Sequence, residues 1–221
     1  MAFDAESSFN RNTVTNRAFS DGAKTWNSRF DGDDYIFGTE PNEYLRRHAS
    51  CWQAGSRVLC VADGEGRNSV WLAGKGLRVD AFDISEVGVG KARKLADAAN
   101  VSVEFSVSDC DSWLWPTADY DGVAAIFVQF ADPPMRERLF ANMIRSLKTG
   151  GILILQGYTP KQLEYKTGGP PLQSHLYTPE MLRNAFASME IVELLEYEAD
   201  LTEGSRHRGQ SALIGLVARR T

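Results

Sequence analysis

Between residues 57 and 158, short apolar runs alternate with segments of helical periodicity. The apolar runs are residues 57–62, 78–83, 102–109, 121–130 and 152–158. Strands that alternate with helices form a mostly parallel sheet covered by helices on both faces. The run over 121–130 is almost continuously apolar, which is typical of a strand buried on both sides. This alternation predicts an α/β fold.

The chain after residue 158 departs from strict alternation. A looser segment over 159–177 precedes a helix over 178–188, with Thr178 as its cap and Pro179 at its first position. Two strands, 190–201 and 211–220, then follow with only a polar turn between them. Such a short link predicts an antiparallel pair at the sheet edge. The expected fold is Rossmann-like: a doubly wound, mostly parallel, seven-stranded sheet with a terminal antiparallel strand pair and helices on both faces.

The N-terminal residues differ in composition from the rest. Residues 1–22 are polar and rich in Ser, Asn and Thr, which predicts a flexible extension, and residues 23–221 form the predicted domain. We expect helices over 23–30 and 41–52, and a longer one over 85–100 capped by Ser85.

Composition excludes several classes of protein. The net charge of -5 and the lack of a Lys/Arg cluster argue against binding to bulk nucleic acid. Three scattered cysteines make no disulfide framework, and three histidines without ligand spacing predict no metal. No apolar stretch is long enough to span a membrane, and residues 1–20 do not resemble a signal peptide. A cytoplasmic enzyme fits best. Oligomeric state stays open.

Polar residues and glycines follow three successive strands. Gly64 and Gly66 come directly after the first strand, Asp83 ends the second, and Asp109 ends the third. In doubly wound sheets the ligand lies at the carboxyl ends of the strands, where strand order reverses. A carboxylate at the position of Asp83 accepts hydrogen bonds from ribose hydroxyls. An adenosine-containing ligand is therefore predicted.

Each of these signals has a simpler interpretation. A Gly-x-Gly sequence after a strand is often only a tight turn. An aspartate at the end of a strand, such as Asp109 or Asp111, commonly caps a short turn. It is the order of the three features, one after each successive strand, that favours a binding site.

The choice between a dinucleotide and a methyl donor depends on one position. A dinucleotide site has a third glycine three residues after the second, where this chain has Ser69. The terminal antiparallel pair also differs from a plain dinucleotide fold. Both observations favour a methyl donor.

The chain resembles the class I S-adenosylmethionine-dependent methyltransferases, and within them the small tellurite-resistance-type branch. The resemblance rests on "WNSRF", "YIFGTEPNEYL", "VLCVADGEGRNSVWLAGKGLRVDAFDIS", "LKTGGILILQGYTPKQLEYKTGGPP" and "EGSRHRGQSALI". These segments cover nearly everything after residue 25. Two departures stand out: Cys60 and Ala62 replace the acid and first glycine of the broad motif, and Val128-Gln129-Phe130 replaces the Cys-His-Leu of many relatives.

The resemblance implies S-adenosylmethionine as cofactor and a set of contacts to it. The glycine turn would line the methionine and ribose, Asp83 would hold the ribose, and Ile84 would pack on the adenine. The adenine edge would meet Asp109 and Cys110. The full implied set is Ala62, Asp63, Gly64, Gly66, Asn68, Asp83, Ile84, Asp109, Cys110, Val128 and Gln129, with Tyr35, Phe37 and Gly38 closing over it. For Tyr35 and Phe37, plain core packing is the alternative.

A sulfonium methyl group is already activated, so the protein must align the acceptor and exclude water. A general base is needed only for an acceptor that is protonated at neutral pH. The candidates for base or substrate contact are Tyr158, His207, Gln129, Tyr165 and Arg206. A solvated turn is the competing interpretation for His207, and sequence slightly favours it.

The predicted function is methyl transfer to a small-molecule acceptor such as a thiol or a chalcogen oxyanion. A nucleotide-dependent oxidoreductase on a similar sheet is one alternative. A catalytically silent protein that only binds the donor is another, because Gln129 replaces the family histidine.

Overall fold

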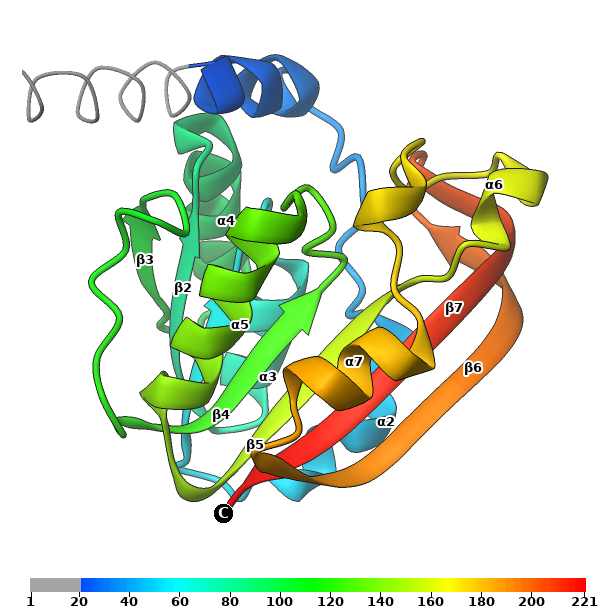
Figure 1. The fold of residues 1–221 in the computed structure, drawn as a ribbon. Helices are drawn as coiled ribbons and strands as arrows, with labels where there is room; N and C mark the ends of the chain where they lie inside the picture. Colours follow the sequence, from blue (N-terminus) through cyan, green and yellow to red (C-terminus); the bar gives the residue numbers. More distant parts are fainter. Residues whose placement is uncertain (1–20) are drawn as a thin grey trace, which may run out of the picture.

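The computed structural model describes residues 21–221, which form one seven-stranded sheet with helices on both faces (Figure 1). The strands are β1 (Arg57–Val61), β2 (Arg78–Asp83), β3 (Glu104–Val107), β4 (Tyr120–Ile126), β5 (Leu147–Tyr158), β6 (Met189–Glu203) and β7 (His207–Arg220). Most of the predicted extension, residues 1–20, lies outside the described residues, and its last two residues belong to a helix over 21–30.

The strand order is β3-β2-β1-β4-β5-β7-β6. Strands β1 to β5 run parallel, and β7 is antiparallel to both of its neighbours, β5 and β6. The predicted fold is confirmed, including the terminal antiparallel pair at the sheet edge. Strand order reverses between β1 and β4, so the carboxyl ends of these two strands are where a ligand is expected.

Alternate side chains of each central strand enter two separate cores. Leu59 and Val61 of β1 pack in one core with α5 (Pro133–Ser146) and α7 (Pro179–Ala185). The intervening Val58 and Cys60 pack in the other core. The helices of that second face are α2 (Glu43–His48), α3 (Arg67–Gly74) and α4 (Glu86–Ala98), with the 3-10 turn η1 (Ala49–Cys51). Burial on both faces explains the continuously apolar strands.

The predicted helix caps are present. Ser85 accepts a hydrogen bond from the Gly88 N–H, and Thr178 accepts one from the Met181 N–H. The helix expected over 41–52 is shorter, because Asn42 caps it and the chain continues as η1 after His48. Two short elements, α6 (Gln162–Tyr165) and η2 (Gln173–His175), lie in the segment after β5.

Several strand boundaries differ from those expected. Strand β3 is only four residues long, and β5 begins at Leu147 rather than at residue 152. Leu147 is extended because it pairs with Tyr120 of β4. Strand β4 ends at Ile126, before the end of its apolar run, because Phe127 adopts a φ of 56°. The chain thus leaves the sheet at Phe127 and turns across its carboxyl edge.

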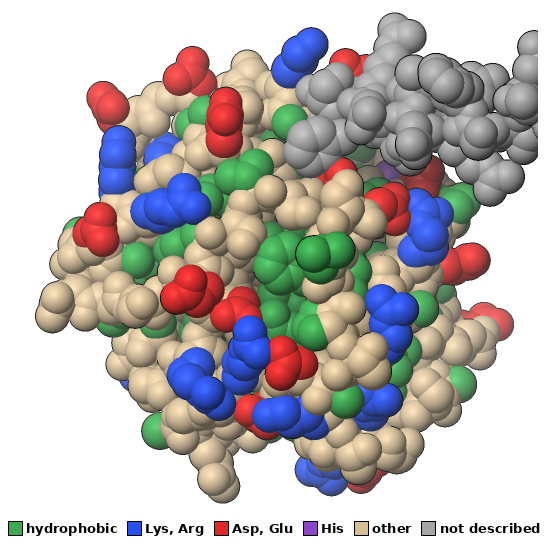
Figure 2. Space-filling view, turned by 90° about the vertical axis from the view of Figure 1, so that its left-hand side faces the viewer, with side chains coloured by type: hydrophobic (Ala, Val, Ile, Leu, Met, Phe, Trp, Pro, Cys, Tyr) green, Lys and Arg blue, Asp and Glu red, His purple; other side chains and the backbone are tan. Residues whose placement is uncertain are grey.

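The side of the molecule at the β3 edge carries a group of hydrophobic side chains bordered by mixed charges (Figure 2). Lysine and arginine side chains on this face are interspersed with aspartate and glutamate. Over residues 21–221, every helix is too short or too polar to cross a membrane.

Candidate active site

The turn after β1 is held in a left-handed conformation at three positions. The φ angles are 50° at Ala62, 61° at Gly64 and 89° at Gly66. Ala62 thus adopts the conformation that glycine supplies in the broad family motif, at a cost of about 1–2 kcal/mol for a residue with a Cβ. A Cβ at Gly66 would lie only 2.6 Å from the Ala92 Cβ, so glycine there lets α3 approach α4. The N-terminus of α3 therefore opens at the carboxyl edge of the sheet.

Two carboxylates flank this turn. Asp83 accepts hydrogen bonds from the Gly64 N–H at 2.9 Å and the Ser85 N–H at 2.8 Å. Asp63 accepts one from the Ser69 hydroxyl. Burial raises the pKa of Asp63 to about 7 and that of Asp83 to about 6, despite these bonds. Both groups would be stabilised in their charged form by a cationic ligand.

Ser69 occupies the position at which dinucleotide-binding turns carry their third glycine. Its side chain is fully buried, and its hydroxyl also donates to the Gly66 carbonyl at 3.2 Å. The Ser69 side chain, which is hydrogen-bonded to Asp63, therefore fills the space that a glycine leaves open in dinucleotide-binding turns.

The turn after β3 is organised by Asp109. Its carboxylate accepts hydrogen bonds from the Asp111 N–H at 2.7 Å and the Ser112 N–H at 2.6 Å, and from the Ser112 hydroxyl at 3.0 Å. Asp109 thus caps the turn, which is the alternative to a binding role that the sequence analysis gave for it. Cys110 is buried beside it, and Ile84 is half-buried at the end of β2.

The helix over residues 21–30 packs on this edge of the sheet. A Cβ at Gly64 would lie 3.2 Å from the Phe30 ring, and one at Gly22 would lie 3.0 Å from Ile84. The Ser85 hydroxyl donates to Asn27 at 2.6 Å. The first described helix therefore covers the residues predicted to hold the adenosine.

The chain that follows this helix is held by a buried ion pair that sequence analysis missed. Lys91 of α4 lies 2.5 Å from Glu65 of the glycine turn, and its ammonium also donates to the Asp34 carbonyl at 2.6 Å. Tyr35 donates to the Lys91 carbonyl at 3.1 Å, and the Phe37 N–H donates to Glu65 at 3.4 Å. Tyr35 thus lies against α4 and Phe37 against the turn. That they close over the cofactor stays a prediction.

Gly38 ends this covering segment against the β6–β7 turn. A Cβ there would lie 3.3 Å from the Gly204 nitrogen, and its φ of 74° favours glycine.

A cavity of about 520 Å³ opens beside the glycine turn, at the ends of β4 and β5. Its walls come from the first helix, the covering segment, the β4 and β5 ends, the segment after α6 and the β6–β7 turn. The lining residues are Thr25, Trp26, Arg29, Ile36, Phe37, Phe127, Gln129, Phe130, Tyr158, Gly168, Gly169, Pro170, Pro171, Leu172, His175, Arg206 and His207. This size suits a small molecule.

The two residues predicted to lie beside the sulfonium have other partners. The Gln129 amide donates to the Tyr158 carbonyl at 2.9 Å and the His175 carbonyl at 3.1 Å, and it accepts from the Tyr158 N–H at 2.6 Å. Gln129 therefore positions the cavity wall. Val128 packs in the core with α5 and α7, so its side chain contributes no contact to the cavity.

His207 lies in the cavity wall with only 11% of its side chain exposed, which corrects the expectation of a solvated turn. It begins β7, and its ring lies 4.4 Å from the Phe127 ring and 4.5 Å from the Phe37 ring, centroid to centroid. Burial and the charge of Arg67 lower its pKa, although Glu203 opposes the shift. The imidazole is therefore neutral at neutral pH, with Nδ1 toward Glu203.

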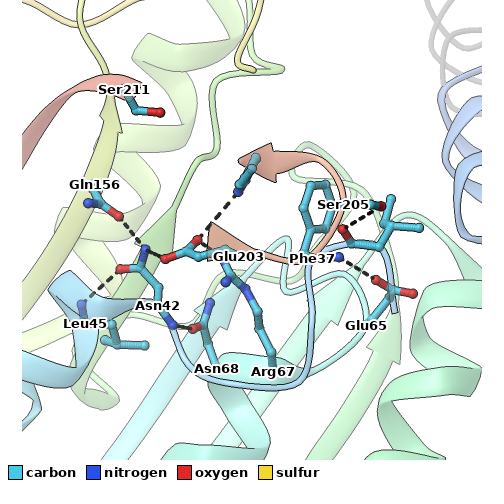
Figure 3. Close-up of polar contacts among 12 residues, drawn as sticks. Phe37, Asn42, Leu45, Glu65, Arg67, Asn68, Gln156, Glu203, Ser205 and Ser211 are labelled. Carbon is cyan, nitrogen blue, oxygen red and sulfur yellow. Dashed lines mark hydrogen bonds and ion pairs between the residues drawn. The ribbon is translucent and has the colours of Figure 1, made fainter. Parts of the chain in front are cut away.

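Glu203 is the centre of a polar network that links four segments (Figure 3). Its carboxylate accepts from Arg67 at 2.7 Å and from Asn42 at 2.9 Å. Burial alone would raise the pKa of Glu203, but His207 and Arg67 hold it at about 2. Asn42 in turn donates its backbone N–H to Asn68 at 2.9 Å, so the described partner of Asn68 is Asn42.

The Tyr158 hydroxyl is buried and has no hydrogen-bond partner within residues 21–221. Burial raises its pKa well above the ordinary value. Tyr165 lies outside the cavity lining and donates to Glu198 at 2.6 Å, whereas Arg206 lines the cavity. Of the five candidates for base or substrate contact, the cavity thus brings together Tyr158, His207, Arg206 and Gln129.

The described residues contain no cluster of three or more His, Cys, Asp or Glu side chains that could hold a metal ion. The residues at the edge do fit a cationic adenosyl cofactor: Gly64 and Gly66 carry no side chain, and the carboxylates of Asp63 and Asp83 lie beside them.

Comparisons with known proteins agree with this arrangement. The methyltransferase domain family matches residues 58–151. The thiopurine S-methyltransferase of Pseudomonas fluorescens (strain Pf0-1) is 27% identical over 195 residues, which cover 78% of this chain and 85% of that protein.

Two solved structures share the fold. One comes from work on the conversion of a disulfide bond into a thioacetal group during echinomycin biosynthesis. It is 17% identical with a TM-score of 0.73, and the aligned region covers 90% of this chain and 91% of that chain. TehB from Haemophilus influenzae has a TM-score of 0.65 at 17% identity and covers 81% of this chain and 62% of its own. The domain match, the relative and the strand order together support a class I S-adenosylmethionine-dependent methyltransferase.

Proposed function

We propose that the enzyme methylates a small molecule through a sulfur or other chalcogen atom, bound in the cavity of about 520 Å³ beside the glycine turn. The observation that carries this proposal is the position of that cavity. It lies at the ends of β4 and β5, next to the strand-order reversal where the cofactor of this fold binds. Its volume is that of a site for a small ligand.

The bound cofactor supplies an activated methyl group on a sulfonium. Asp63, Gly64 and Gly66 would hold its methionine and ribose part, and Asp83 would hold the ribose hydroxyls. Ile84, Asp109 and Cys110 would contact the adenine. The remaining expected contacts are to Ala62 in the turn, to Asn68 at the start of α3, and to Tyr35, Phe37 and Gly38 in the covering segment. Because residues 21–30 pack on Gly64, Ile84 and Ser85, we expect this helix to shift outward when the cofactor enters.

His207 is the proposed general base. It lines the cavity and is neutral at neutral pH because burial lowers its pKa. With Nδ1 directed at Glu203, its Nε2 lone pair is free to take a proton from the acceptor. Such a base is needed for a thiol and superfluous for an acceptor that is already an anion.

Tyr158 is the proposed substrate contact. Its hydroxyl is buried at the cavity wall without a described hydrogen-bond partner, and a buried polar group in that state is costly. A hydrogen bond to the acceptor would satisfy it. Gln129 holds the backbone of Tyr158 and acts as a positioning residue.

Sulfur as the acceptor atom is supported by two of the similar proteins. The relative from Pseudomonas fluorescens is a thiopurine S-methyltransferase, and the structure with a TM-score of 0.73 concerns a disulfide-to-thioacetal conversion. Aromatic rings line the cavity, as an apolar thiol requires.

The test is release of S-adenosylhomocysteine from S-adenosylmethionine over a panel of thiols, selenite, tellurite, and aromatic amines and phenols. We expect turnover with thiols or chalcogen compounds above that with amines and phenols. Turnover with amines or phenols alone would contradict the assigned acceptor. Cofactor binding without turnover on any of them would instead favour a silent binding protein.

A further inference from the structure

The cavity carries positive charge in a chain whose net charge is -5. Arg29 from the first helix and Arg206 from the β6–β7 turn both line it. None of its described lining residues is an aspartate or a glutamate. Two guanidinium groups and no described carboxylate thus line the acceptor cavity of an acidic protein.

These two arginines differ from those arginines of the fold that form ion pairs. Arg57, Arg138 and Arg219 each pair with a carboxylate within 3.0 Å. Within residues 21–221, neither Arg29 nor Arg206 has an acidic partner within 4.0 Å. Arg29 instead lies over the Trp26 ring, with 4.7 Å from its guanidinium carbon to the ring centroid. Both side chains are therefore available to an anion from solution.

Aromatic side chains form the rest of the wall. The Phe127 and Tyr158 rings stack with centroids 4.7 Å apart, and Phe37 and Trp26 join them. At the rim, Phe130 is 37% exposed and Leu172 is 57% exposed. Large apolar side chains that stay exposed at a concave surface mark a binding site for an apolar group.

We propose that the methyl acceptor is an aromatic anion, in which a planar ring carries a carboxylate or sulfonate separate from the atom that is methylated. The ring fits the aromatic wall, and the anionic substituent pairs with Arg29 and Arg206. Guanidinium groups bind carboxylates through two parallel hydrogen bonds, which adds orientation to affinity. This inference rests on the proposed function, since it describes the substrate of the same cavity.

The test compares 4-mercaptobenzoate with the uncharged 4-mercaptobenzamide, which has the same ring and thiol. We expect kcat/KM for the benzoate to exceed that for the amide by about tenfold or more, as for a hydrogen bond to a charged group. Arg29→Gln and Arg206→Gln should each remove most of this preference by lowering kcat/KM for the benzoate much more than for the amide. Arg138→Gln, which removes a charge from the surface pair with Asp111, is the matched control and should change neither rate.

The main alternative is that the two arginines bind the cofactor, and measuring cofactor affinity distinguishes it from this proposal. If the two arginines bind the carboxylate of S-adenosylmethionine, the Arg→Gln variants will weaken cofactor binding and lose both acceptors equally, which overturns the proposal. Equal rates for benzoate and amide in the wild type overturn it too, but leave the methyltransferase function standing.

A wild type that methylates neither thiol would contradict the proposed function, and binding of 4-(methylthio)benzoate then decides this proposal. Calorimetric binding that is lost in the Arg29→Gln/Arg206→Gln double variant supports an aromatic anion site. Binding that persists in that variant, or is absent in the wild type, overturns it.

Discussion

The Glu203 carboxylate lies 3.6 Å from Nδ1 of His207, and each side chain is only 11% exposed. Glu203 stays ionised because His207 and Arg67 hold its pKa at about 2 against the effect of burial. The pair therefore consists of a charged carboxylate and a neutral imidazole at neutral pH. We propose that the nearby carboxylate favours the proton on Nδ1, which leaves Nε2 to act as the base.

If His207 accepts the proton of a thiol, methyl transfer should fall at acid pH and level off once the imidazole is neutral. Because the pKa of His207 is lowered from 6.5, the acid limb should lie below 6.5. His207→Gln should lower kcat by about 100-fold or more for a protonated alkyl thiol. Its effect on a thiophenol already ionised at the assay pH should be small.

Glu203→Gln tests the positioning role separately. Removing the charge should lower the pKa of His207 further, because Glu203 is the group that raises it. NMR titration of the three histidine side chains would measure that shift directly, and the thermal midpoint would report on the fold. An unchanged His207 titration in this variant would contradict the pairing.

Tyr158 and Tyr177 offer a matched pair of buried hydroxyls, both without a described hydrogen-bond partner. Only Tyr158 lines the cavity. Each Tyr→Phe change should leave the free energy of unfolding unchanged or raise it by about 1 kcal/mol, since no hydrogen bond is lost. Tyr158→Phe should raise the KM for the acceptor severalfold, and Tyr177→Phe should not. Equal KM values for the two variants would remove Tyr158 from substrate binding.

Asp83 should make the stability of the cofactor-free protein depend on pH. Its pKa rises from 3.8 to about 6 on folding, so the folded chain holds the proton more tightly. Its contribution is therefore largest below pH 3.8 and is lost as the pH rises through about 6. The free energy of unfolding of the wild type relative to Asp83→Asn should fall by about 3 kcal/mol over that window. Denaturant unfolding at several pH values measures this difference, and a pH-independent difference would contradict the shift.

Ala62 and Ala118 compare the strained turn with an ordinary one. Both adopt a positive φ, 50° and 53°, but Ala118 lies in an exposed turn away from the cavity. Glycine relieves about 1–2 kcal/mol of strain and costs up to about 1 kcal/mol in chain entropy. Both Ala→Gly variants should thus raise the free energy of unfolding by up to about 1 kcal/mol. Destabilisation by Ala62→Gly alone would show that its methyl group packs in the turn.

The sequence was sufficient to predict the sheet, because its central strands are buried on both faces and its helix caps lie in local motifs. Ser85 and Thr178 cap the helices that they were expected to cap. The boundaries that were wrong depend on tertiary contacts. Leu147 joins β5 by pairing with Tyr120, and Phe127 leaves the sheet in a conformation that no apolar pattern signals.

For the site, sequence order predicted which residues gather at the carboxyl edge, but not their partners. Glu65, Arg67 and Asn68 stand together in "GEGRN", yet they contact Lys91, Glu203 and Asn42, which lie far away in the chain. Glu203 itself was missed, because a glutamate before a polar turn looks like a solvated residue. The burial of His207 likewise follows from the covering segment folding over it.

The central claim is that the turn after β1 and Asp83 hold S-adenosylmethionine. Calorimetric titration of S-adenosylmethionine and NADH into the wild type and Asp83→Ala tests it most directly, with circular dichroism to check that the variant is folded. We expect S-adenosylmethionine to bind the wild type, NADH not to bind, and Asp83→Ala to weaken cofactor binding by about tenfold or more. Binding of NADH without S-adenosylmethionine, or unchanged cofactor affinity in folded Asp83→Ala, would contradict it.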